Sequence, residues 1–176
     1  MKRLALIALV LASALSCDDS PTSPSDPNTA RFTAILLPSN EVPAVTNADA
    51  TASGTMEMTM RVTRDAANNV TGATYDFTLH MTGFPSDTVL TGAHIHNAGP
   101  NVNAGIVVPV PLAPTDTLTN GQGTITKTGL VGTSTATLTA AAIAQGIFNN
   151  PGGNYFNIHT SRNPGGAIRG QLVRME

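Results

Sequence analysis

The sequence has no tryptophan, only one cysteine, and few charged side chains, which make up 11% of its 176 residues. One cysteine excludes an intramolecular disulfide, so burial of apolar side chains must hold the fold together. The formal net charge of −2 offers no basic surface for nucleic acid. The sequence also has no G-x-S-x-G, phosphate-loop or H-E-x-x-H motif, and no cysteine nucleophile beyond its N-terminal region. No catalytic residue is therefore predicted.

The composition that remains is rich in threonine, glycine and small apolar residues. Threonine favours strands, and glycine favours the turns between them, so this mixture favours a β-rich extracytoplasmic domain over a helical enzyme. The length of the chain suits one domain rather than two.

Residues 1–16 have the features of a lipoprotein signal peptide. Lys2 and Arg3 form a basic start, and an apolar run from Leu4 follows that is too short for a comfortable membrane span. The letters "ALS" directly before Cys17 resemble the lipobox of bacterial lipoproteins, which implies that Cys17 carries lipid. The protein is then expected in the bacterial cell envelope, anchored to a membrane and extracytoplasmic. The alternative is ordinary signal cleavage that leaves an incidental thiol.

A polar segment separates this signal from the rest of the chain. Residues 17–30 are rich in proline, serine and aspartate and contain almost nothing to bury. Such a composition is typical of a flexible tether. The folded domain is expected to span residues 31–176.

Within this domain, apolar residues recur with a period of two between glycine, proline and asparagine turns. This pattern predicts an antiparallel β-sandwich of roughly seven to nine strands. The segment 139–150 is the exception, because its pattern is helical and Thr139 suits the N-cap position. The expected strands are 31–37, 54–63, 70–82, 88–96, 105–110, 121–131, 154–160 and 166–174.

Three segments carry a resemblance to a known family: "LPSNEVPAV" (37–45), "GAHIHNAGPNVNAGIVVPV" (92–110) and "GNYFNIHTSRNPGGAIRGQL" (153–172). They resemble the CHRD domain, named for its repeats in chordin and widespread in bacterial secreted proteins. The resemblance covers about residues 31–174. It implies an immunoglobulin-like antiparallel β-sandwich or barrel, similar to the fold of copper–zinc superoxide dismutases. It implies no established biochemical activity.

Three of the four histidines are candidate metal ligands. His94 and His96 are two residues apart in an expected strand, so they project from one face, about 6.5 Å apart, while Ile95 faces the core. His159 alternates in the same way with Ile158. If the two strands are neighbours, the three imidazoles meet and suit zinc or copper. The alternatives are solvated histidines, histidines that hydrogen-bond loops and Arg169, or a pocket for an anion or another ligand.

Arg169 is expected to turn outward beside these histidines, because Ile168 and Leu172 fit the core. It is able to guide an anion to the site. A structural pairing with a carboxylate or a backbone carbonyl is the favoured interpretation, and Glu41 is one candidate partner.

These observations predict a lipid-anchored module at the cell envelope with a binding or structural role, rather than an enzyme. The alternative is a copper- or zinc-binding protein with a dismutase-like site and redox activity. The resembled dismutases carry a His-x-His pair on the corresponding sheet face. The expected partners are a membrane, through the anchor, and an unidentified protein or small molecule.

Overall fold

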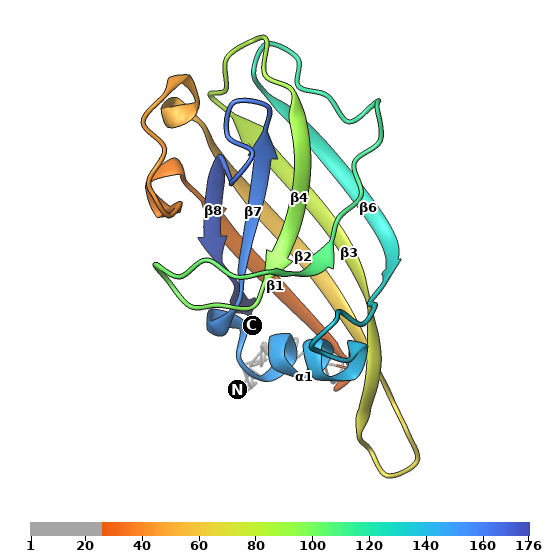
Figure 1. Ribbon diagram of the computed structural model, residues 1–176. Helices are drawn as coiled ribbons and strands as arrows, with labels where there is room; N and C mark the ends of the chain where they lie inside the picture. The colour runs from red at the N-terminus through yellow and green to blue at the C-terminus, as the bar shows by residue number, and fades with distance from the viewer. Residues whose placement is uncertain (1–25) are drawn as a thin grey trace, which may run out of the picture.

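The computed structural model describes residues 26–176, so the expected signal peptide, Cys17 and most of the expected tether lie outside the described residues. Residues 26–176 form two antiparallel β-sheets that pack face to face, with a single α-helix at one end of the sandwich (Figure 1). The predicted β-sandwich is therefore confirmed.

The two sheets contain all nine strands of the described part. The larger sheet has the order β6-β3-β2-β1-β9. Its strands are β1 (Thr29–Leu36), β2 (Ser53–Arg64), β3 (Val70–Thr82), β6 (Gly123–Val131) and β9 (Val173–Met175). The smaller sheet has the order β5-β4-β7-β8. Its strands are β4 (Leu90–His96), β5 (Ile106–Pro109), β7 (Tyr155–Thr160) and β8 (Ile168–Gln171).

The helix α1 (Ala140–Asn149) packs against β3. It begins where the sequence predicts, because the Thr139 side chain accepts a hydrogen bond from the Ala142 backbone N–H at 3.1 Å. Three short 3-10 turns complete the elements: η1 (Pro38–Asn40), η2 (Ala48–Thr51) and η3 (Pro151–Gly153). No helix between residues 26 and 176 has both the length and the apolar character needed to cross a membrane.

The first strand begins two residues before the expected boundary of the domain. Its alternating burial already starts at Ala30, which is buried, and the carbonyl of Asn28 accepts a hydrogen bond from the Val62 backbone N–H at 2.8 Å. Residues 28–30, at the end of the expected tether, are therefore bound to the domain.

The core lies between the two sheets and is built by period-two alternation. Met56, Met58 and Met60 of β2 are all buried, as the alternation in this strand predicts. Across the sandwich, the rings of Phe77 on β3 and Phe156 on β7 lie 5.9 Å apart between centroids. Each such side chain contributes roughly 1.5–3 kcal/mol through burial. This core holds the smaller sheet in place, and the polar face of that sheet carries the candidate site.

Candidate metal centre

The strand register brings the candidate residues into rows across the smaller sheet. His94 on β4 lies opposite Asn157 on β7, which in turn lies opposite Arg169 on β8. In the flanking rows, His96 lies opposite Tyr155, and Gly92 lies opposite His159. Directly opposed residues of an antiparallel pair have Cβ atoms about 4.5–5.5 Å apart. The sequence could place each residue on this face, but only the pairing of β4 with β7 makes them neighbours.

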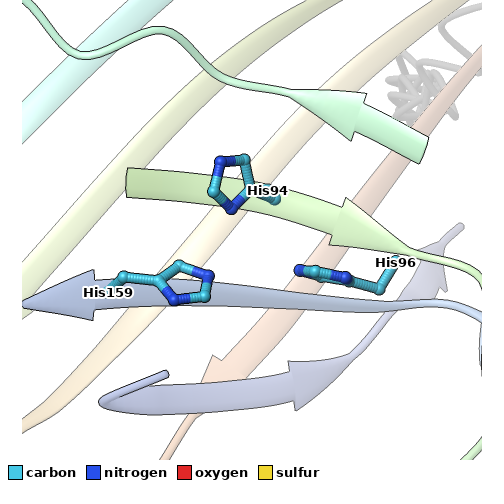
Figure 2. Close-up of side chains that lie close together, drawn as sticks. All are labelled: His94, His96 and His159. Carbon is cyan, nitrogen blue, oxygen red and sulfur yellow. The ribbon is translucent and has the colours of Figure 1, made fainter. Parts of the chain in front are cut away.

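The three histidines form one cluster. One potential ligand atom from each of His94, His96 and His159 lies within 4.8 Å of those of the other two. Figure 2 shows the rings of His96 and His159 directed towards one another, with one ring nitrogen of His94 directed between them. The three histidines therefore lie close together, as the sequence analysis predicted. Their role as metal ligands stays a prediction.

Backbone carbonyls determine which nitrogens of two histidines carry protons. His96 Nδ1 lies 2.8 Å from the carbonyl oxygen of Ala104, and His159 Nδ1 lies 2.9 Å from that of Pro164. A carbonyl oxygen only accepts hydrogen bonds, so both Nδ1 atoms donate. In a neutral ring, the other nitrogen, Nε2, then carries a lone pair. The two Nε2 atoms that face the centre are therefore free to bind a cation.

Burial keeps these rings neutral. Burial, together with repulsion from the nearby His159 and His96, lowers the pKa of His94 from 6.5 to about 4. Burial also lowers the pKa of both His96 and His159, against the opposing effect of their hydrogen bonds. Neutral imidazole is the form that binds metals. The cluster is thus in its metal-binding protonation state at neutral pH.

His94 has a buried nitrogen without a partner. Its Nδ1 is buried and makes no hydrogen bond, which is uncommon for a buried polar atom. Space for the ring comes from Gly92, because a Cβ added there would lie 2.7 Å from His94 Cε1. A larger residue at position 92 would therefore have to shift the imidazole from this position.

Asn157 is a member of the cluster to which the sequence pattern assigned no role. Its side chain is buried, and its Oδ1 lies 3.0 Å from His96 Nε2 and 3.0 Å from His159 Nε2. Alternation in β7 already predicted that it shares a face with His159. An isolated asparagine matches no metal motif, so its position beside two histidines is visible only in the folded sheet.

Arg169 lies on the outer face of the sheet, as expected, but this face is covered at Arg169. It is only 1% exposed, because the loop of residues 97–105 folds over this face. The guanidinium donates hydrogen bonds to the carbonyls of Gly99 and Val102 and to the side chain of Asn103. The same loop supplies the Ala104 carbonyl to His96, so Arg169 anchors the loop that orients this histidine.

An aromatic ring connects the arginine to the histidine cluster. Arg169 Cζ lies 3.4 Å from the centroid of the Tyr155 ring. The partner of Tyr155 on β4 is His96. The imidazole of His96 stacks on the Tyr155 ring, with 4.6 Å between the centroids and 7° between the planes. This stack holds the His96 ring in one orientation.

Glu41 does not form the ion pair with Arg169 that the sequence suggested. No such pair occurs among residues 26–176, and Arg169 uses the carbonyls of the covering loop instead. Burial raises the pKa of Glu41 from 4.5 to about 7, while the charge of Arg169 and the amide of Asn157 oppose that rise. The carboxyl packs against Gly166, where an added Cβ would lie 2.4 Å from Glu41 Oε1.

Comparison with known proteins gives the family. The family model for the CHRD domain matches residues 32–172. The chain belongs to the CHRD-domain family. The match contains the three segments that suggested this family in the sequence, and every residue of the histidine cluster lies inside it. No curated protein and no solved structure matches the chain. Membership of the CHRD family suggests an extracellular binding or structural module.

Proposed function

We propose that this CHRD domain is a metal-binding module that holds Zn(II) or Cu(II) between His94, His96 and His159. The observation that carries the proposal is the convergence of three uncharged imidazoles, two of which have their Nδ1 protons committed to backbone carbonyls. A histidine ligand commonly donates its remaining N–H to a carbonyl in this way. The ligand set would be His94 Nδ1, His96 Nε2 and His159 Nε2.

The choice of metal follows from the donor atoms. Imidazole nitrogens suit zinc and copper, and Cu(II) binds most sites of this type more tightly than Zn(II). In a tetrahedral zinc site with bonds of about 2.0–2.1 Å, the ligand atoms are roughly 3.3–3.4 Å apart. The histidine nitrogens lie within 4.8 Å of one another, so small rotations of the rings bring them to bonding distance.

The proposal is tested by calorimetric titration of metal-free protein with Zn(II) and Cu(II), in the wild type and in Gly92→Ala. The wild type should bind one ion per chain. The added methyl group should displace the His94 ring and weaken binding about tenfold or more, a loss typical of disturbed ligand orientation. The thermal stability should change little, because the ring is the movable end of a half-buried side chain.

Gly72→Ala is the matched control, because Gly72 is also a strand glycine and an added Cβ meets only Thr63 Oγ1, at 3.4 Å. This variant should bind metal as the wild type does. Absence of one-to-one binding by the wild type would contradict the proposal, as would equal affinity in Gly92→Ala.

We also propose that lipid on Cys17 anchors the module to a membrane of the bacterial cell envelope. The support is the sequence alone: a basic start, a short apolar run and the "ALS" letters before a single cysteine. In cells, Cys17→Ala should move the protein from the detergent phase to the soluble extracytoplasmic fraction. Detergent partitioning that survives this change would exclude the anchor.

A further inference from the structure

We propose that Asn157 supplies the fourth ligand of this centre through its Oδ1 atom, so that four protein groups enclose the metal ion. This inference rests on the proposed function, because it concerns the ion that the three histidines would hold. It assigns a site in which no coordination position is left open to solvent or substrate.

The position of Asn157 carries the first part of the argument. Its register partner on β4 is His94, and its Oδ1 lies 3.0 Å from both His96 Nε2 and His159 Nε2. These separations are already close to the roughly 3.3–3.4 Å between neighbouring ligand atoms of a tetrahedral zinc site. Asn157 is 2% exposed, so water cannot easily replace it in this position.

The second part of the argument concerns which atoms at the centre carry protons. Both Nδ1 atoms of His96 and His159 donate to carbonyl oxygens, so their neutral rings have no proton on Nε2. Oδ1 of Asn157 has no proton to give either. Three atoms with lone pairs thus face one another at hydrogen-bonding distance, which is unfavourable until a cation lies between them.

The orientation of the Asn157 amide is the third part of the argument. The structure places Oδ1, and not the NH₂ group, 3.0 Å from both His96 Nε2 and His159 Nε2. With the oxygen in this position, a cation between the three atoms would turn their mutual repulsion into ligation.

An enclosed site with three nitrogens and one oxygen has a clear chemical preference. Structural zinc sites have four protein ligands, whereas catalytic sites keep one position for water or substrate. A carbonyl oxygen beside three imidazoles favours Zn(II) or Cu(II) over Cu(I), which prefers thiolates and thioethers. The ion would tie β4 to β7 and stabilise the folded domain through the free energy of binding.

Co(II) is the probe for this test, because its visible spectrum reports coordination number and reveals an open position when azide binds. The wild type should give a tetrahedral Co(II) spectrum that azide does not change. Asn157→Leu, which removes the oxygen at similar size, should bind Co(II) about tenfold or more weakly and become sensitive to azide. Asn157→Asp restores an oxygen ligand and should retain at least the affinity of the wild type, without azide sensitivity.

The outcomes separate this inference from the proposed function. A wild type that binds Co(II) through its histidines but responds to azide would overturn the fourth ligand alone. The same conclusion follows if Asn157→Leu binds with wild-type affinity. A wild type that binds no Co(II) overturns both proposals. If Asn157→Leu does not fold, the azide response of the wild type and of Asn157→Asp still decides the question.

Discussion

Metal-free His96→Ala should bind Zn(II) at least about 100-fold more weakly than the wild type. Loss of a residue that only supports a ligand typically costs 10–100-fold in metal affinity, so loss of a ligand should reach or exceed the upper end of that range. His96 is the most deeply buried of the three histidines, at 6% exposed, and its ring is oriented by both Ala104 and Tyr155. Water is poorly placed to substitute for it.

His80→Ala is the matched control for this measurement. His80 is an exposed histidine on β3, in the other sheet, where its Nδ1 lies 3.0 Å from Thr124 Oγ1. A competition titration against a chromophoric chelator measures the affinity of all three proteins. His80→Ala should match the wild type. Equal affinity in His96→Ala and the wild type would leave the cluster with only a structural role.

Arg169→Met should lower the free energy of unfolding by about 3–5 kcal/mol, because three acceptors lose their hydrogen-bond donor. The buried guanidinium satisfies the carbonyls of Gly99 and Val102 and the side chain of Asn103. Each buried acceptor that loses its donor costs about 1–3 kcal/mol. Methionine fills much of the volume and donates nothing, so the loop of residues 97–105 should detach.

Arg61→Met provides the comparison for that loss. Arg61 forms a salt bridge with Asp76 at 2.6 Å, but its side chain is 51% exposed. Exposed ion pairs contribute about 0–1 kcal/mol, so this variant should be nearly as stable as the wild type. Urea unfolding of the metal-free proteins measures both changes. A loss below about 1 kcal/mol for Arg169→Met would show that the arginine does not hold the loop.

Alternation along the strands predicted which face each residue of the site occupies. Ile95 and Ile158 are buried in the core, so their histidine neighbours had to project from the opposite face. The helix and its N-cap at Thr139 were equally predictable, because capping is a local property of the sequence. The pairing of β4 with β7 did not follow from the residues, since it depends on contacts between segments about 60 positions apart.

The sequence could not predict that a loop covers the outer face of the smaller sheet at Arg169. An alternating strand gives the same pattern whether its polar face meets water or a loop, so Arg169 was expected to turn outward. The loop of residues 97–105 is instead bound down by Arg169 and by Gln171, whose side chain donates to the carbonyl of Ala98 at 3.1 Å. The sequence pattern gave Asn157 no role for a similar reason. Its contacts with His96 and His159 arise only when β4 and β7 pair.

X-ray absorption at the zinc edge of the zinc-loaded wild-type protein shows directly whether histidines hold the ion. Three histidine ligands predict a first shell of nitrogen and oxygen at about 2.0–2.1 Å and the multiple scattering that imidazole rings produce farther out. His96→Ala should lose part of that outer scattering. A spectrum of hydrated zinc without imidazole scattering would contradict the binding of zinc by the three histidines.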